Sequence, residues 1–375
     1  MQGSIRERSA GVWQIRVSLG RDQTTGRYRY ASATVRGGRR DAQRAAAKLF
    51  SKASEGKLVT TADTLDELFA RWLAHLESLD RAPKTLVEHR RMATEISSRL
   101  GKVKLRDLRG TDIDALYDHL RRKGLSTSTV RRYHAVLSAA LNRAVRWGLL
   151  ERSPLLHATP PPLGTVEASC PLPAEVNQLI DMAEQHDPLL ASFLLLAATT
   201  GCRRGELCGL RWSDIDLDGA QLIIRRAISD VPGRLEVRST KTGRIRRLSL
   251  DTLSVGALRA QLDRARASAA QVGGSLEDEA YVWSQAVDHS EPWRPSRVSA
   301  SFVRIRGEAG LPSVQLHHLR HFAASVMLAG GVDVRTAAGR LGHAQPAITL
   351  KTYAHVMEAA DRNAADIVGR VLEKT

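Results

Sequence analysis

The sequence has little cysteine, few aromatic residues and no long apolar run. Three cysteines in 375 residues cannot make the disulfide framework of a secreted domain, so the reducing cytoplasm is expected. No run reaches the roughly 18 apolar residues of a membrane-spanning helix, and the most apolar segment, Leu189–Thr199, predicts a buried helix. The first residues, MQGSIRERSAG, lack the apolar core of a signal peptide. Secreted and membrane-spanning classes are therefore excluded.

Acidic residues are also scarce relative to basic ones. Lys and Arg number 56 against 40 Asp and Glu, a formal net charge of +16. Residues 1–60 carry +9, residues 61–157 carry +6 and the remaining 218 residues only +1. A basic excess confined to the front of a chain indicates modules that bind a polyanion, nucleic acid above all. The hydrophobic fraction of 43% is sufficient for packed cores.

The first basic region, residues 1–56, predicts a small sheet with one helix. Apolar and polar residues alternate on both sides of Ile15, which is typical of a strand, and residues 27–35 are rich in β-branched and aromatic residues. An Ala-rich helix follows over residues 41–54. Two or three strands capped by a helix are expected.

The second basic region, residues 61–157, has helical periodicity. Thr64 and Glu67 form a capping box before the first apolar stripe, and Thr111 with Asp114 suggests another helix start. The four expected helices begin near residues 64, 83, 111 and 128. They form a compact helical domain whose outer faces are basic.

Five prolines mark residues 158–173 as an extended linker to a third region, residues 174–375. Periodicity there predicts three helices, then three short strands, then further helices. The helices are expected near 174–186, 189–200 and 203–211, and the strands near 221–226, 234–239 and 244–250. The fold class is therefore multidomain and mainly α, with a small N-terminal sheet, a four-helix domain and a mixed α+β C-terminal domain.

Two basic motifs stand out in the third region. The segment Thr200–Glu206 (TGCRRGE) places Arg203 at a predicted helix start, where a guanidinium can bind phosphate. Taken alone, the motif equally fits an ordinary helix N-terminus with a solvated arginine. The segment Ser239–Arg244 (STKTGR) predicts a hairpin turn between two strands with Lys241 at its tip. A lysine in such a turn is most often simply solvated.

Histidines and a tyrosine form the other two motifs. His317 and His321 have the i, i+4 spacing of a zinc pair, but the usual central Glu and a third ligand are missing, whereas His317 and Arg320 share a helix face suited to one anion. Further on, the Leu-Gly-His sequence ending at His343 is followed ten residues later by Tyr353. A lone tyrosine is more often a packing residue than a nucleophile.

In this order, the four motifs resemble the signature of the tyrosine recombinase (phage integrase) family: Arg, Lys, His-x-x-Arg, His or Trp, then Tyr. The resemblance covers roughly residues 171–357 and includes flanking positions: the T-G-x-R-x-G-E motif, the L-x-x-L-R-H motif around Arg320 and the L-G-H motif. One departure is His318, where the family often has Asp. It lies between the paired His and Arg and leaves the signature intact.

The resemblance implies a role for each motif residue and requires neither cofactor nor metal. Arg203 and Arg320 would hold the scissile phosphate, Lys241 would be the general acid, and Tyr353 would be the nucleophile. The supporting residues would be His317, His343 and Glu206, the last orienting its neighbours.

The resemblance also implies partners. Residues 1–56 resemble the domain that integrases use on arm sites in DNA, with Arg16 and Arg29 as candidate contacts. Residues 61–157 would bind core-site DNA through Arg131 and Arg132, and residues 174–375 would be the catalytic domain. The amphipathic segment 358–372 would be exchanged within a homotetramer on DNA, or would pack on its own domain. The protein would act in the cytoplasm at the nucleoid, not at a membrane. Whether it also needs an excision factor or a host DNA-bending protein stays open.

The implied function is integration and excision of a mobile element through a 3′-phosphotyrosine intermediate. Two other enzymatic interpretations remain: a type IB-like topoisomerase, which would relax any supercoiled plasmid, and a zinc enzyme, which would carry stoichiometric zinc. The third alternative is a non-catalytic DNA-binding regulator of the same fold. Decay of that kind should alter catalytic positions, yet all six hold functional residue types.

Overall fold

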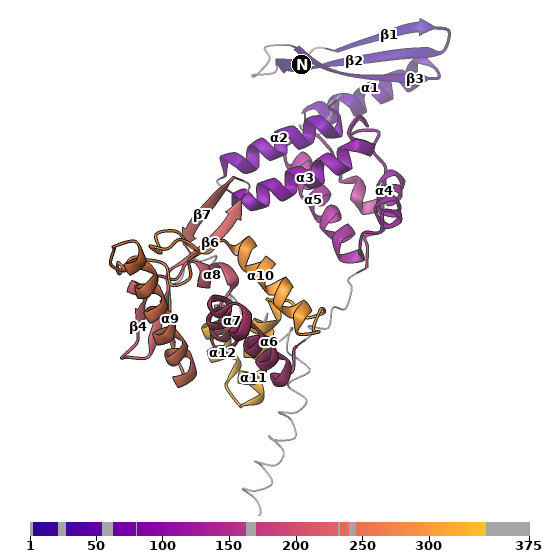
Figure 1. The fold of residues 1–375 in the computed structure, drawn as a ribbon. Helices are drawn as coiled ribbons and strands as arrows, with labels where there is room; N and C mark the ends of the chain where they lie inside the picture. The colour runs from indigo at the N-terminus through magenta and orange to yellow at the C-terminus, as the bar shows by residue number, and fades with distance from the viewer. Residues whose placement is uncertain are drawn as a thin grey trace, which may run out of the picture. The chain divides into compact units, whose positions relative to one another are not determined.

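The structure is a computed structural model that describes residues 3–21, 28–54, 63–79, 81–162, 170–231, 233–239 and 245–342. The chain divides into two compact units, residues 1–165 and residues 166–375 (Figure 1). Both are built from helices and small antiparallel sheets, as the composition and periodicity predict.

The first unit begins with an antiparallel sheet of strand order β1-β2-β3 followed by a helix. The elements are β1 (Gly3–Ser9), β2 (Val12–Arg21), β3 (Tyr28–Arg36) and α1 (Arg39–Ser54). The alternation around Ile15 is realised, because Ile15 and Val17 lie on the covered face and pack with Ala46 of α1. The sheet therefore has three strands, and α1 covers one face.

Four helices make up the rest of this unit. They are α2 (Leu65–Ser78), α3 (Pro83–Leu100), α4 (Gly110–Arg122) and α5 (Thr127–Arg146), followed by the 3₁₀ turn η1 (Pro154–His157). The predicted capping box of α2 is present: the Glu67 amide donates to Thr64 Oγ1 over 3.4 Å, and the Thr64 amide donates to Glu67 Oε2 over 2.6 Å. The core contains the predicted stripes, with Trp72 and Tyr117 both almost fully buried.

The predicted cap of α4 is wrong by two residues, because Arg109 with Asp112 takes the place expected for Thr111 with Asp114. The helix begins at Gly110, and Asp112 caps it by accepting from the Arg109 amide over 2.9 Å. Asp114 instead accepts from the amide of Thr159 over 2.7 Å, which ties the start of the proline-rich segment to α4. The carboxylate assigned to the cap thus holds a tertiary contact.

The second unit packs helices around α7. The helices among its described residues are α6 (Pro173–His186), α7 (Pro188–Thr200), α8 (Arg204–Cys208), α9 (Thr252–Gln271), α10 (Pro295–Glu308), α11 (His318–Ala329) and α12 (Val334–Leu341). Because α7 is apolar around almost its whole circumference, it is buried, and Phe193 lies 5.1 Å from the ring of Trp283 and 6.0 Å from that of Trp293. The expected extension of α8 to residue 211 is wrong: α8 ends at Cys208, and Arg211 forms a β-bridge with Tyr281.

The strands of this unit form two sheets. They are β4 (Ile215–Asp216), β5 (Gln221–Ile224), β6 (Arg226–Val231), β7 (Arg234–Ser239) and β8 (Arg246–Ser249), with the 3₁₀ turn η2 (Trp212–Asp214) before β4. In the described part of the chain, β8 pairs with β5 in a β4-β5-β8 sheet and β7 pairs with β6. The predicted hairpin around Lys241 is therefore corrected, because the strands on its two sides belong to different sheets. The strands β4 and β6 were not expected.

Candidate active site

The junction of α7 and α8 lies against two helices that are distant in the sequence, α11 and α12. Gly201 ends α7 in the left-handed conformation, with φ of +64°. A methyl group at this position would lie 2.5 Å from Leu341 Cδ2 of α12 and 3.2 Å from Ala323 Cβ of α11. Glycine therefore allows both the turn and the close approach of α11 and α12.

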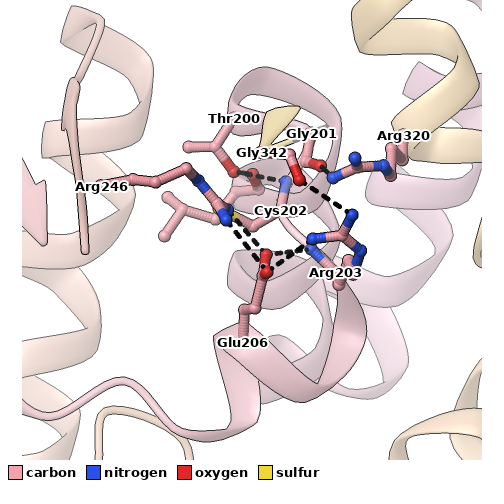
Figure 2. Close-up of polar contacts among 9 residues, drawn as sticks. Thr200, Gly201, Cys202, Arg203, Glu206, Arg246, Arg320 and Gly342 are labelled. Atoms are coloured by element: carbon pink, nitrogen blue, oxygen red, sulfur yellow. Dashed lines mark hydrogen bonds and ion pairs between the residues drawn. The ribbon is translucent and has the colours of Figure 1, made fainter. Parts of the chain in front are cut away.

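Arg203 is fixed by its own helix and by the end of α12 (Figure 2). Glu206 accepts from the Arg203 amide through Oε2 and from Arg203 Nη1 through Oε1, each over 2.9 Å. Arg203 Nη2 donates to the carbonyl oxygen of Gly342 over 3.1 Å. The predicted motifs around Arg203 and Gly342 are thus joined directly.

A second arginine, Arg246 of β8, belongs to this network and was missed in the sequence. Its Nη1 and Nη2 donate to Glu206 Oε1 and Oε2 over 3.1 and 2.8 Å, and its side chain is 7% exposed (Figure 2). The available signal was alternation, since Arg246, Leu248 and Leu250 are buried between exposed Arg247 and Ser249. An arginine in phase with two buried leucines requires a buried partner.

The Glu206 carboxylate is ionised at the centre of this network. Its side chain is 2% exposed, and burial alone would raise its pKa. The hydrogen bonds and charge of Arg246, with those of Arg203, outweigh burial and hold the pKa of Glu206 below its usual range. The network therefore combines one carboxylate with two guanidiniums.

Arg320 of α11 lies near Arg203, on the side away from Arg246 (Figure 2). It is 4% exposed, and Nη1 donates to the carbonyl oxygen of Gly201 over 2.8 Å. Within the described residues its Nη2 has no hydrogen-bond partner. Burial and the nearby Arg203 lower the pKa of Arg320 to about 10, so it stays charged at neutral pH. A buried cation with a free donor is suited to an anionic ligand.

The histidines at the start of α11 adjoin Arg320. Burial and the charges of Arg320 and Arg203 lower the pKa of His317, while burial and His317 lower that of His321 to about 4. The rings of His317 and His321 meet edge to face, 4.9 Å apart. His318 Nδ1 accepts from the Gln315 amide over 3.2 Å. Neutral imidazoles therefore stand beside the guanidiniums.

A cavity of about 270 Å³ reaches this group. It is lined by Phe193, Ala197, Cys202, Arg204, Leu316, His317 and Arg320. Its lining combines three polar side chains, His317, Arg204 and Arg320, with apolar ones.

Three predicted site residues, Lys241, His343 and Tyr353, lie outside the described residues. In the described ranges, no three His, Cys, Asp or Glu side chains are grouped so that they could hold a metal ion, and no helix combines the length and apolarity needed to cross a bilayer.

The four candidate DNA contacts lie in the first unit. The exposed Arg16 of β2 stacks on the ring of Tyr30 at 3.9 Å. Arg29 is the second residue of β3, and the structure describes its backbone but not its side chain. On α5, Arg131 donates to the carbonyl oxygen of Pro161, and the exposed Arg132 pairs with Glu88 over 3.0 Å. Arg131 is thus already engaged within its own unit.

Comparison with known proteins identifies the second unit. The model of the phage integrase family matches residues 172–360, half of the chain. A tyrosine recombinase XerC-like protein of Caldanaerobacter subterraneus subsp. tengcongensis is 27% identical over 81% of this chain and 82% of its own length. The ICEBs1 integrase of Bacillus subtilis is 25% identical over 97% of this chain and 98% of its own length. The fold is shared with the integrase of the Tn1549 transposon bound to transposon right-end DNA, with a TM-score of 0.70, 17% identity, and coverage of 81% of this chain and 99% of that one.

Proposed function

Because the chain belongs to the phage integrase family, we propose that it is a site-specific recombinase that cuts and rejoins DNA to integrate and excise a mobile element. The single observation that carries the proposal is the meeting of Arg203 and Arg320, from motifs far apart in the sequence, around one turn of backbone. The full-length likeness to an integrase supports a mobile element as the context.

The arginines suit the chemistry of a phosphodiester. The diester carries one negative charge, and its pentavalent transition state carries more. Guanidinium donors aimed at the non-bridging oxygens gain strength as that charge develops. Arg320 retains its proton at neutral pH, since its lowered pKa is still about 10. The pair therefore stabilises charge during bond exchange.

The remaining chemistry is assigned to Tyr353 and Lys241. The Tyr353 hydroxyl loses its proton and attacks phosphorus, and the bond from phosphorus to the 5′-oxygen breaks. Lys241 donates a proton to the leaving 5′-oxygen. The product is a 3′-phosphotyrosine and a free 5′-hydroxyl; attack by a 5′-hydroxyl of another strand reverses the step. One ester replaces another, so the reaction requires neither ATP nor a metal ion. His317 and His343 would assist proton transfer.

The first unit would supply most of the DNA affinity. The net charge of the whole chain is concentrated in residues 1–157. Phosphate contacts by many arginines give DNA binding that falls steeply as the salt concentration rises. We assign arm-site binding to residues 1–56, including Arg16 and Arg29, and core-site binding to residues 61–157, including Arg132. A homotetramer on DNA, acting in the cytoplasm at the nucleoid, completes the proposal.

The test is covalent capture of DNA by the full chain. The protein is incubated with DNA that flanks its own gene, and protein–DNA adducts are resolved on a denaturing gel and mapped. Wild-type protein should give a site-specific 3′-phosphotyrosine, and Tyr353→Phe should bind the same DNA without an adduct. An adduct in the variant would reject Tyr353 as the nucleophile. Relaxation of any plasmid without site preference would favour the topoisomerase, and binding without adduct by the wild type would favour the regulator.

A further inference from the structure

Arg246 is the buried cation of the site to which the family signature gives no role. It lies on β8, and its guanidinium forms a two-pronged pair with Glu206 at 3.1 and 2.8 Å. The guanidinium also packs against the turn that ends α12: a methyl group at Gly342 would lie 2.6 Å from Arg246 Cζ. Gly342 has φ of +71°, so this turn is left-handed where it meets Arg246.

Glu206 is shared between Arg246 and Arg203. Oε1 accepts from Nη1 of both arginines, and Oε2 accepts from Arg246 Nη2 and from the Arg203 amide. Every favourable acceptor direction of the carboxylate is therefore used. With both arginines present, the group retains one net positive charge. Without Arg246, Glu206 would neutralise Arg203 completely.

We propose that Arg246 is a positioning residue that neutralises Glu206, so that Arg203 keeps its charge for the scissile phosphate, and that supports the turn at Gly342. The inference rests on the proposed function, because it takes Arg203 as a phosphate ligand. Arg246 itself is held on Glu206 and acts through Arg203.

The charge balance distinguishes this role from simple packing. Among the described residues, Arg246→Gln leaves Arg203 as the only guanidinium on Glu206, which cancels the charge of Arg203. Glu206→Gln combined with Arg246→Gln removes both buried charges and frees the charge of Arg203 again. A positioning role therefore expects the double variant to be more active than Arg246→Gln alone. A packing role expects the second change to add damage.

The measurement is the rate of covalent complex formation by the full chain on DNA flanking its own gene, at saturating DNA. We expect Arg246→Gln to be slowed about tenfold or more, with DNA affinity changed by less than about threefold, because affinity is spread over many phosphate contacts. The double variant should regain at least about threefold in rate. On DNA with a neutral methylphosphonate at the mapped cleavage position, the ratio of wild-type to Arg246→Gln rates should shrink, since the charge that Arg203 meets is gone.

A matched control comes from the same unit. Arg226 pairs with the buried Asp214 over 2.7 Å, which is a similar ion pair outside the Arg203 network. Arg226→Gln should keep the wild-type rate per folded molecule. If Arg246→Gln behaves like this control, or if the double variant is slower than Arg246→Gln, the positioning role is rejected.

Two further arms keep the test decisive. If Arg246→Gln fails to fold, Arg246→Lys takes its place: it retains the neutralising charge, so it should stay within about tenfold of wild type, and a folded but inactive Lys variant overturns the role. Wild-type protein without an adduct would instead reject the proposed function itself. A normal wild-type adduct with an unaffected Arg246 variant rejects only the role of Arg246.

Discussion

Replacement of Gly201 by alanine should destabilise the second unit more than the same replacement at Gly310, a left-handed glycine with open space around it. Two costs combine. The left-handed conformation, with φ of +64°, costs an alanine about 1–2 kcal/mol. The added methyl group would lie 2.5 Å from Leu341 Cδ2 and 3.2 Å from Ala323 Cβ, an overlap that costs about 1–3 kcal/mol when neighbours must shift.

Gly310 provides the control for the first cost. Its φ is +68°, and a methyl group there would meet nothing within 4 Å. Gly310→Ala should therefore lose only the conformational part, about 1–2 kcal/mol. The difference between the two variants isolates the packing against α11 and α12.

Urea unfolding of the full chain, followed by tryptophan fluorescence, measures that difference. With a denaturant slope of about 1–3 kcal/mol per molar, an extra cost of about 2 kcal/mol lowers the midpoint by roughly 1 M. Gly201→Ala should also slow DNA cleavage, because the Gly201 carbonyl holds Arg320. Equal midpoints for Gly201→Ala and Gly310→Ala would show that the close approach of α11 and α12 to Gly201 contributes nothing to the free energy of unfolding, and would refute the reasoning.

Two further predictions concern buried polar groups. In the folded chain the pKa of His321 is lowered to about 4, so between about pH 6.5 and pH 4 the unfolded chain alone takes up this proton. The free energy of unfolding should therefore be highest above about pH 6.5 and fall as the pH is lowered through this range. In urea midpoints measured against pH, His321→Gln should flatten that decline. Trp283 is fully buried and its Nε1 donates to Ser192 Oγ over 3.0 Å. Trp283→Phe should lower the free energy of unfolding in urea by about 2–3 kcal/mol, and a decrease below about 0.5 kcal/mol would contradict the assigned packing.

Local sequence patterns predicted which helices and strands form better than they predicted where a helix begins or which strands pair. The start expected for the second helix of the four-helix domain, near residue 83, coincides with the start of α3, because Pro83 begins an amphipathic run. The start of α4 could not be chosen from sequence, because two acidic residues, Asp112 and Asp114, compete for the capping role. The outcome depends on Asp114 contacting Thr159, which is distant in the chain.

Strand pairing shows the same limit. Alternation located the segments that became β7 and β8, and their closeness in sequence favoured a hairpin. The structure pairs β8 with β5 and β7 with β6 instead. Hydrogen bonding between strands depends on the whole sheet, and alternation carries no information on which neighbour a strand takes.

The site divides in a similar way. Arg203, Glu206 and Arg320 could be chosen because each belongs to a short motif with a recognisable spacing. Arg246 has no such motif, and its partner Glu206 is 40 residues earlier in the chain. An arginine within a strand is usually solvated. The phase of Arg246 with Leu248 and Leu250 indicates burial, but only the tertiary fold reveals its partner.

The bond from Arg203 to the carbonyl of Gly342 spans 139 positions and has a consequence for synthesis. While a ribosome extends the chain, Arg203 and Glu206 emerge long before β8, and β8 emerges long before the end of α12. The nascent protein already carries the basic excess of residues 1–157, but the guanidinium cluster cannot close until the far end of the second unit is available. Under the proposed function, the chain therefore gains its DNA affinity before it gains the ability to cleave. An unfinished chain would attach to DNA without breaking it, because the contact between Arg203 and Gly342 forms last.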